Sequence, residues 1–111
     1  MIAIIDYQLS NLFSVKHALD SLKVESIITS EPKVLLKAKA AILPGVGAFG
    51  DAMGNLSKFG LINAIQEFIK SDRPFMGVCL GLQLLFSKSF EFGHHQGFDI
   101  IKGEVRKFPQ K

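Results

Sequence analysis

The stretch that decides the fold is 74–86, Pro74-Phe75-Met76-Gly77-Val78-Cys79-Leu80-Gly81-Leu82-Gln83-Leu84-Leu85-Phe86. An apolar run leads into Cys79, and a second apolar run, compatible with a helix, follows it. Glycines stand two residues before and two residues after the cysteine. The pattern predicts a strand, a sharp turn and a helix, which is the arrangement of a nucleophile elbow with cysteine in place of serine.

The spacing of Gly77, Cys79 and Gly81 has a steric reason. At the tip of a strand-to-helix turn the backbone is strained and the chain on both sides passes close to the nucleophile, so glycine leaves the room that a Cβ would occupy. Because the helix starts at the nucleophile, its unpaired N–H groups and positive end lie beside the sulfur and favour the thiolate. The same geometry points the N–H of Leu80 at the oxygen of a tetrahedral intermediate, as half of an oxyanion hole.

A lone cysteine in an apolar strand also has a simpler interpretation, a small buried hydrophobic residue. The Gly-x-Cys-x-Gly spacing at a strand–helix junction favours the nucleophile instead. As the single cysteine of the sequence, Cys79 cannot form an internal disulfide, and residues 1–6 lack the basic start and long apolar run of a secretion signal. A reducing, cytoplasmic setting is therefore expected.

The composition is that of one ordinary globular domain. The chain has 111 residues, of which 48% are hydrophobic and 21% charged, and its formal net charge is +3. Lys33, Lys37 and Lys39 are spaced along one segment and form no basic stripe, so nucleic acid is not predicted as a partner. No window approaches the roughly 20 apolar residues of a spanning helix, so no membrane role is predicted.

Apolar runs and helical periodicity alternate along the first part of the chain. Strands are expected at 2–5, 24–29 and 40–43, and helices at 12–22, from Pro32 and at 61–70. Asn11 is the expected N-cap of the first helix. Alternating elements with short connections predict an α/β fold with an open, mostly parallel, doubly wound sheet of the flavodoxin-like kind.

A glycine-rich segment, 44–54, follows the third expected strand and reads Pro-Gly-Val-Gly-Ala-Phe-Gly-Asp-Ala-Met-Gly. It lies at the carboxyl edge of the sheet, where ligands bind in open α/β folds. The Gly45-Val46-Gly47 peptide can turn a backbone N–H toward a pocket and supply the second donor of an oxyanion hole. A plain glycine-rich loop explains the segment equally well, and the segment matches neither a phosphate-binding loop nor a dinucleotide fingerprint.

The part of the chain after the elbow helix is predicted from turn residues and short apolar runs. Residues 87–97 are polar and bounded by glycine, which predicts a surface loop, and 98–101 with 104–108 are expected to form a short strand pair. The adjacent His94 and His95 project differently and make a poor chelating pair, so no metal site is predicted.

Four motifs stand in a shared order along the chain: Ile4-Ile5-Asp6-Tyr7 with Asn11, residues 43–53, residues 73–86, and Ile101-Lys102-Gly103-Glu104-Val105. With them the sequence resembles the class I (triad) glutamine amidotransferases, most closely the glutaminase subunits of imidazole glycerol phosphate synthases. By this resemblance, residues 1–111 would be the N-terminal part of a single glutamine amidotransferase domain.

The resemblance implies a glutaminase. In such enzymes a cysteine attacks the side-chain amide of L-glutamine, forms a glutamyl thioester and releases ammonia to a barrel-type synthase (cyclase) subunit, the partner in a heterodimer. The ammonia serves the synthesis of imidazole glycerol phosphate in histidine biosynthesis, and no cofactor is implied.

The resemblance also implies roles for particular residues. Carried onto this chain, Cys79 is the nucleophile, and Val46, Gly47 and Leu80 line the oxyanion hole through backbone N–H groups. Gly47 and Gln83 would contact the bound glutamine. Gln83 lies one helical turn after Cys79 on the same face, although an exposed helix glutamine fits this spacing as well.

The sequence departs from the family pattern in two places. The first loop of the family usually reads Asp-Tyr-Gly-x-Gly-Asn, but Gln8 and Ser10 replace both glycines here. An amidotransferase that serves another pathway, such as surface-sugar biosynthesis, therefore stays open. The activating His and orienting Glu of the family lie in the C-terminal half of the full domain and have no counterpart in 80–111.

The missing His and Glu predict that the chain is inactive by itself, because departing ammonia needs a general acid. A non-catalytic, flavodoxin-like interaction module is the alternative. A different cysteine hydrolase on the same fold fits less well, since such proteins lack the Pro-Gly-Val-Gly-Ala-Phe-Gly loop. Uncovered strand edges and apolar faces of a truncated sheet predict self-association.

Overall fold

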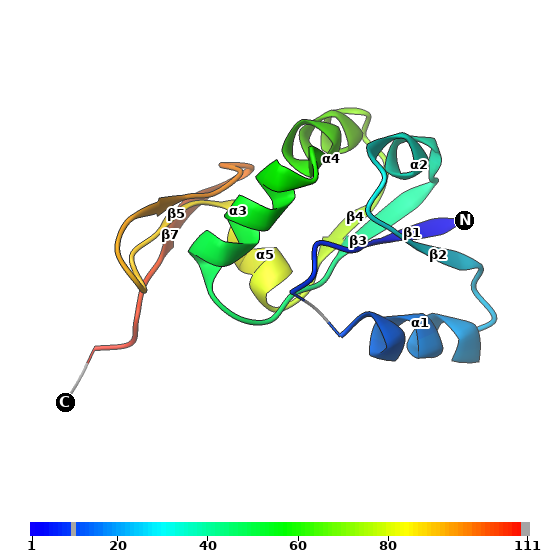
Figure 1. Cartoon of the computed structure of the whole chain (residues 1–111), viewed down its shortest axis with the longest axis horizontal. Coiled ribbons are helices and arrows are strands. Elements are labelled where there is room, and N and C mark those ends of the chain that lie inside the picture. Colours follow the sequence, from blue (N-terminus) through cyan, green and yellow to red (C-terminus); the bar gives the residue numbers. More distant parts are fainter. Residues whose placement is uncertain (10, 110–111) are drawn as a thin grey trace.

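A parallel sheet forms the centre of the computed structural model, which describes residues 1–9 and 11–109 (Figure 1). The sheet has four strands in the order β2-β1-β3-β4. The strands are β1 (Ile2–Ile5), β2 (Ser26–Thr29), β3 (Ala40–Leu43) and β4 (Phe75–Gly77). Ile4 of β1 pairs in parallel register with Ile28 of β2 and with Ile42 of β3. The predicted open, parallel α/β sheet is confirmed.

Helices lie on both faces of this sheet, as the doubly wound pattern predicts. They are α1 (Leu12–Ser21), α2 (Pro32–Lys37), α3 (Phe49–Lys58), α4 (Leu61–Lys70) and α5 (Leu80–Leu84). In Figure 1, α1 lies on one side of the sheet, and α2 and α4 lie on the other. The side chain of Asn11 accepts the N–H of Ser14 at 3.4 Å and caps α1. Among the helices of the described residues, none is long and apolar enough to cross a membrane.

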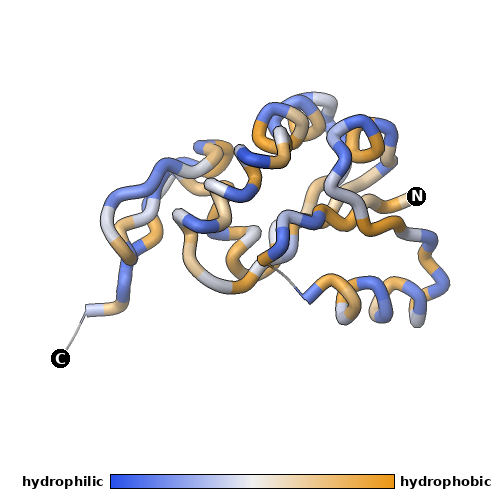
Figure 2. The backbone as a smooth tube through the Cα atoms, viewed as in Figure 1, coloured by the Kyte–Doolittle hydropathy of each residue, from blue (hydrophilic) through white to orange (hydrophobic). Residues whose placement is uncertain are grey.

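The core lies between the sheet and the helices α2 to α4. Ile5 of β1 is fully buried, and so are Ile65 and Phe68 of α4. Ile65 and Phe68 are three residues apart and therefore share one face of α4. The Phe68 ring lies 6.2 Å from the ring of Phe75 on β4, which fixes α4 against the sheet. Figure 2 shows the same division, with hydrophobic residues along the central strands and alternating hydropathy along the helices.

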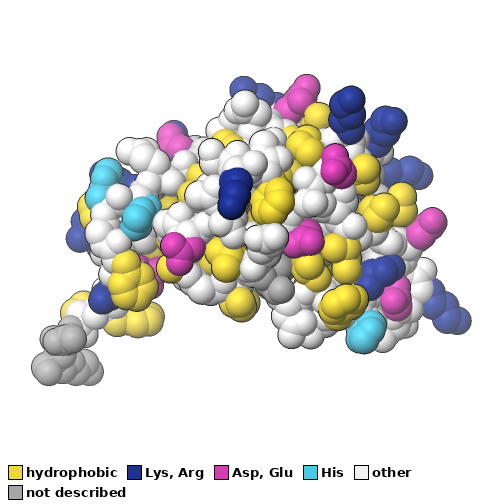
Figure 3. All heavy atoms as spheres, in the orientation of Figure 1, with side chains coloured by type: hydrophobic (Ala, Val, Ile, Leu, Met, Phe, Trp, Pro, Cys, Tyr) yellow, Lys and Arg dark blue, Asp and Glu magenta, His cyan; other side chains and the backbone are white. Residues whose placement is uncertain are grey.

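Charged side chains of both signs lie on one face of the molecule. On the face drawn in Figure 3, acidic and basic groups are interspersed. This mixture agrees with the small net charge of +3.

The glycine-rich segment after β3 differs from a plain loop, because its second half forms α3. The helix begins at Phe49, and its buried side chains are Phe49, Ala52 and Leu56. These residues recur at steps of three and four, so they form one apolar stripe against the core. A glycine in a helix costs up to about 1 kcal/mol relative to alanine, and burial of this stripe offsets that cost at Gly50 and Gly54.

The predicted surface loop over 87–97 is wrong, because this region contributes to a second sheet. Strands β5 (Phe86–Ser89), β6 (His95–Gln96) and β7 (Ile101–Val105) pair in the order β6-β5-β7. The strands are polar because much of this sheet is exposed, so an apolar run could not reveal them. Lys88 on β5 faces Glu104 on β7 and forms an ion pair at 3.8 Å.

The expected strand pair formed by 98–101 and 104–108 is also wrong. A single strand, β7, runs through Gly103 and pairs with β5 in parallel. Phe98 is buried in the main core, and its N–H donates to the carbonyl of Leu84 at 2.8 Å. The segment before β7 is therefore held by α5 and cannot pair with the segment after it.

One edge of the central sheet carries apolar surface. In the described part of the chain, β4 pairs with β3 alone, and Met76 at its centre is 58% exposed. A hollow of about 340 Å³ opens over the face of the sheet that carries α1, lined by Ile2, Leu19, Ala40, Ala41, Ile42, Pro74, Phe75 and Met76. An edge strand with exposed apolar neighbours is a place where further chain can add.

The loop after β1 contains a strained residue that yields a stability prediction. Gln8 has φ 72°, the left-handed region that favours glycine, and its N–H donates to the Asp6 carboxylate at 3.1 Å. We expect Gln8→Gly to raise the free energy of unfolding in urea by up to about 1 kcal/mol. Gln8→Ala keeps the Cβ and is the matched control. A Gln8→Gly chain less stable than Gln8→Ala would contradict the assignment. Ser10, the second departure from the family loop, lies outside the described residues.

Candidate active site

Cys79 lies at a sharp turn between β4 and α5, as the sequence predicts. The cysteine is exposed, and its backbone has φ 54° and ψ −121°. A positive φ is rare for a residue other than glycine, and such strain costs about 1–3 kcal/mol. The turn therefore holds the side chain outward in a conformation that the rest of the fold must stabilise.

The two glycines that flank the cysteine are required by close backbone contacts. A Cβ added at Gly77 would lie 2.8 Å from the Cα of Leu82, and one at Gly81 would lie 1.7 Å from the carbonyl oxygen of Leu43. Neither contact can be relieved by a side-chain rotation, because the neighbouring atoms are backbone. The steric reason inferred from the Gly-x-Cys-x-Gly spacing is confirmed.

The Gly45-Val46-Gly47 loop lies beside the elbow. The loop follows β3, whose Leu43 pairs with Gly77 of β4, so both turns leave the same edge of the sheet. The N–H of Leu80 donates to the carbonyl oxygen of Gly45 at 3.2 Å. The sequence-predicted residues of the elbow and of the oxyanion loop are thus brought into direct contact.

Two of the predicted oxyanion donors are already engaged in this structure. Leu80 uses its N–H on Gly45, and Val46 donates its N–H to the carbonyl oxygen of Leu9 at 2.8 Å. Val46 and Gly47 are exposed, and Gly47 has φ 107°, a conformation open to glycine. Before the N–H groups of Val46 and Leu80 can bind an oxyanion, each must break its hydrogen bond to a backbone carbonyl.

Gln83 lies on α5, one turn after Cys79. Its N–H donates to the carbonyl oxygen of Cys79 at 3.2 Å, and its side chain is half-buried. This position is compatible with a contact to substrate bound at Cys79, and the role remains a prediction.

Tyr7 is a residue of the site that sequence reasoning missed. Its side chain is fully buried, and its hydroxyl donates to the carbonyl oxygen of Pro44, directly before the Gly45-Val46-Gly47 loop. Asn55 of α3 donates its side-chain amide to the Tyr7 carbonyl at 2.9 Å. Burial raises the pKa of Tyr7 above its ordinary range. The signals in the sequence are its place two residues after a buried strand and in the Ile4-Ile5-Asp6-Tyr7 motif, neither of which indicates a contact with Pro44.

The raised pKa of Tyr7 predicts a loss of stability in alkali. The unfolded chain loses the phenolic proton near pH 10, whereas the folded chain retains it, so stability is complete below this pH and falls as pH rises. We expect a slope of up to about 1.4 kcal/mol per pH unit in urea unfolding above about pH 10. Because the sequence has one tyrosine and no tryptophan, tyrosinate absorbance reports this group alone.

Tyr7→Phe is the control for the alkaline prediction, and its slope should be shallower. Appearance of tyrosinate in the folded parent chain at its ordinary pKa would contradict the burial effect.

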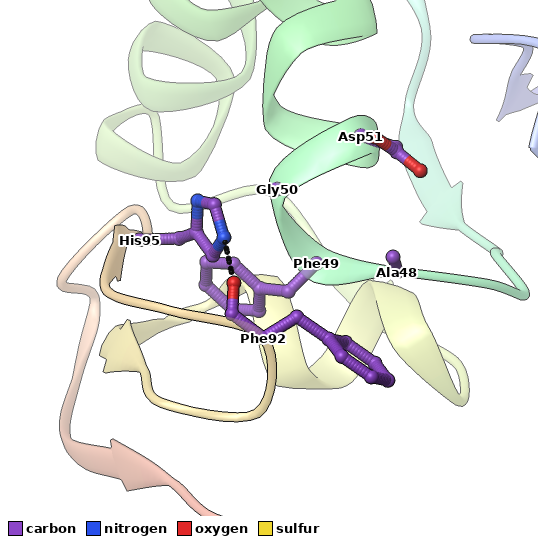
Figure 4. Close-up of a pocket in the computed structure, with 6 residues that line it drawn as sticks. All are labelled: Ala48, Phe49, Gly50, Asp51, Phe92 and His95. Atoms are coloured by element: carbon purple, nitrogen blue, oxygen red, sulfur yellow. Dashed lines mark hydrogen bonds between the residues drawn. The ribbon is translucent and has the colours of Figure 1, made fainter.

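An open hollow of about 520 Å³ adjoins the Gly45-Val46-Gly47 loop (Figure 4). It is lined by Ala48, Phe49, Gly50, Asp51, Phe92 and His95. Figure 4 shows that Ala48 directly precedes α3, that Phe49, Gly50 and Asp51 form its start, and that Phe92 and His95 come from the facing loop and strand. The Nε2 atom of His95 lies 2.7 Å from the carbonyl oxygen of Phe92.

The histidines of the chain lie in separate surroundings. His17 is exposed on α1, His94 stacks on Phe90 with ring centroids 5.2 Å apart, and His95 lies on β6 against Phe92. Within 1–9 and 11–109, no group of three or more His, Cys, Asp or Glu residues is arranged to hold a metal ion.

Comparison with known proteins places this geometry in a family. The sequence matches the family model "Glutamine amidotransferase class-I" over residues 3–107. It is 48% identical over 109 residues to "Imidazole glycerol phosphate synthase subunit HisH" of Geobacter metallireducens, covering 98% of this chain and 52% of that protein. It is 50% identical to the protein of the same name from Sulfurimonas denitrificans, covering 97% of this chain and 52% of that protein. The chain therefore spans about half the length of these curated relatives.

The fold agrees with a solved structure as well. A crystal structure of a glutamine amidotransferase superposes with a TM-score of 0.79 at 17% identity, covering 96% of this chain and 56% of that one. At this identity the match supports the fold alone, which is the α/β fold described above. From the family match across almost the whole sequence, together with the cysteine elbow and its adjoining glycine loop, the chain belongs to the class I glutamine amidotransferases.

Proposed function

We propose that this chain carries the nucleophile of a glutaminase that supplies ammonia for the synthesis of imidazole glycerol phosphate in histidine biosynthesis. The relatives at 48% and 50% identity bear the name of the HisH subunit of that synthase. The observation that carries the proposal is the exposed Cys79, held in a strained elbow against the Gly45-Val46-Gly47 loop.

The chemistry begins with the Cys79 thiolate attacking the side-chain carbonyl carbon of L-glutamine. The carbonyl π electrons move onto oxygen, and backbone N–H groups of Val46, Gly47 and Leu80 stabilise the resulting oxyanion. The C–N bond then breaks, and ammonia leaves after its nitrogen gains a proton. Water hydrolyses the remaining glutamyl thioester to glutamate and regenerates the thiol. Gly47 and Gln83 would hold the substrate during these steps.

The oxyanion step requires a rearrangement of the loop. The N–H of Val46 must leave the Leu9 carbonyl, and the N–H of Leu80 must leave the Gly45 carbonyl. A substrate oxyanion is a stronger acceptor than a neutral carbonyl, so its formation favours this exchange. The structure thus corresponds to a resting arrangement of the elbow and loop.

Proton delivery to the departing nitrogen is the step for which the described residues provide no obvious donor. His94 stacks on Phe90 and His95 contacts the carbonyl of Phe92, while His17 is exposed on α1. We expect the activating His and orienting Glu of the family to lie in the half of the relatives' sequence that this chain does not match. Residues 1–111 alone should therefore show no glutaminase turnover, and measurable turnover would refute this expectation.

The partner is proposed to be a barrel-type synthase (cyclase) subunit that receives the ammonia in a heterodimer. The relatives are named as subunits of a synthase, which supports an assembly of more than one chain. An amidotransferase serving another pathway, such as surface-sugar biosynthesis, is the second candidate, favoured by the unusual Gln8 in the first loop.

Trapping of the thiol by a glutamine analogue tests the proposed function. The full chain is incubated with a diazo-ketone analogue of L-glutamine, and adducts are located by mass spectrometry. We expect Cys79 to react faster than free cysteine does, after both rates are normalised to their rates with iodoacetamide. Cys79→Ser is the control and should remain unlabelled. A normalised rate no greater than that of free cysteine would refute the proposal for this chain and favour a non-catalytic interaction module.

A further inference from the structure

We propose that Tyr7 is a positioning residue for the nucleophile elbow, acting through the oxyanion loop. The hydroxyl of Tyr7 donates to the carbonyl of Pro44 and occupies the space beside Gly45. Through this contact it fixes the Gly45 carbonyl, which in turn receives the N–H of Leu80. The inference rests on this geometry and does not require that glutamine is the substrate.

The first step of the argument is the fit between Tyr7 and Gly45. A Cβ added at Gly45 would lie 1.9 Å from the Tyr7 hydroxyl oxygen, 3.2 Å from its ring carbon Cζ and 3.3 Å from the Cβ of Leu80. The phenol oxygen therefore occupies the position that any other side chain at residue 45 would need. Gly45 is required because Tyr7 lies there, and the φ of Gly45 is not among the positive values.

The second step is that Tyr7 itself has little freedom to move. The ring is fully buried, and the Tyr7 carbonyl accepts the side-chain amide of Asn55 from α3 at 2.9 Å. The neighbouring Asp6 donates its N–H to Thr29 of β2 at 2.9 Å. The sheet and α3 therefore hold the Tyr7 phenol in a fixed position. A fixed contact of this kind is needed where backbone N–H donors must be placed precisely.

The third step connects this support to the reacting sulfur. Pro44, which accepts the Tyr7 hydroxyl, and Gly45, which accepts the Leu80 N–H, are consecutive residues. Leu80 directly follows Cys79 and begins α5. A displacement of the Pro44–Gly45 peptide therefore moves the adjacent Gly45 carbonyl. One hydrogen bond transmits this movement to Leu80, which directly follows Cys79.

The test compares hydrogen exchange in the parent chain and in Tyr7→Phe, which removes one oxygen and keeps the ring. We expect the amides of Val46 and Leu80 to exchange about fivefold faster in the variant. The amides of Ala52 and Phe59, which donate to the carbonyls of Ala48 and Asn55 at the two ends of α3, serve as internal controls and should change by less than about twofold. Equal acceleration of all four amides, or no acceleration at Val46 and Leu80, would overturn the proposal.

A double-mutant comparison tests the contact itself. Gly45→Ala should be poorly folded in the parent chain, because its methyl group meets the Tyr7 oxygen. In the Tyr7→Phe background that oxygen is gone and the nearest remaining atoms are at 3.2 and 3.3 Å, so the double variant should be more stable than Gly45→Ala alone. Strict additivity of the two substitutions, measured in urea, would overturn the proposal.

A chemical readout separates this inference from the proposed function. In Tyr7→Phe, the rate with the diazo-ketone glutamine analogue should fall about fivefold relative to the rate with iodoacetamide. The reason is that the Pro44 carbonyl loses the hydrogen bond that anchors the loop to the sheet while Val46 and Leu80 release their carbonyl acceptors. An unchanged ratio would contradict the positioning role. If the parent chain does not react with the analogue, the proposed function fails, and the exchange and double-mutant measurements still decide the role of Tyr7.

Discussion

Gly81→Ala is expected to prevent the elbow from forming. The added methyl carbon would lie 1.7 Å from the carbonyl oxygen of Leu43 and 2.7 Å from its carbonyl carbon. Leu43 belongs to β3, which is hydrogen-bonded to β1 on one side and β4 on the other, so its backbone cannot move without breaking the sheet. We expect a loss of at least about 4 kcal/mol in the free energy of unfolding, a value that would leave little folded chain.

Gly54→Ala is the matched control for this prediction. Gly54 lies in α3, is exposed, and has no atom within 4 Å of an added Cβ. Alanine is the better helix former there, so the variant should be more stable than the parent by up to about 1 kcal/mol. Circular dichroism in urea measures both variants. Similar stability of Gly81→Ala and Gly54→Ala would show that the elbow does not pack against β3 as described.

Cys79→Gly is expected to stabilise the chain while removing its reactivity. The backbone of Cys79 has φ 54° and ψ −121°, a conformation that glycine adopts without the strain of about 1–3 kcal/mol that a Cβ imposes. Glycine also gains freedom in the unfolded chain, which cancels about 0.5–1 kcal/mol of this relief. A net gain of about 1 kcal/mol in urea unfolding remains.

Cys79→Ala separates the backbone effect from the loss of sulfur. Alanine removes the thiol but keeps the Cβ, so its stability should stay close to that of the parent. Both variants should lose all labelling at position 79. Equal stability of the glycine and alanine variants would mean that the backbone at residue 79 is unstrained. It would contradict the view that the fold holds Cys79 in a strained conformation for its reactivity.

The sheet and the elbow could be predicted because their signals are local. Each buried strand is a short apolar run, and the elbow is marked by two glycines at fixed distances from Cys79. The helix α3 was harder to predict, since Gly50 and Gly54 suggest a loop, although Phe49, Ala52 and Leu56 supply a helical stripe. Strands β5 to β7 carry polar residues on an exposed sheet, and pairing between distant segments does not follow from local pattern.

For the candidate site, the sequence predicts which segments meet but not the orientation of their peptides. Cys79, Leu80 and the Gly45-Val46-Gly47 loop meet as expected, because parallel strands end at one edge of a sheet. The peptide orientations in the loop could not be predicted, since glycine admits several of them. The contact of Tyr7 with Pro44 joins residues 37 positions apart and depends on the finished fold.

The position of β4 at the margin of the described sheet has a consequence for the surroundings of Cys79. The strand ends at Gly77, two residues before Cys79, and its outer side is unoccupied by any strand within 1–9 and 11–109. Any segment that extends the sheet beyond β4 in parallel would deliver its own C-terminal end next to the thiol. Pairing at this edge would therefore change the surroundings of the sulfur as well as extend the sheet.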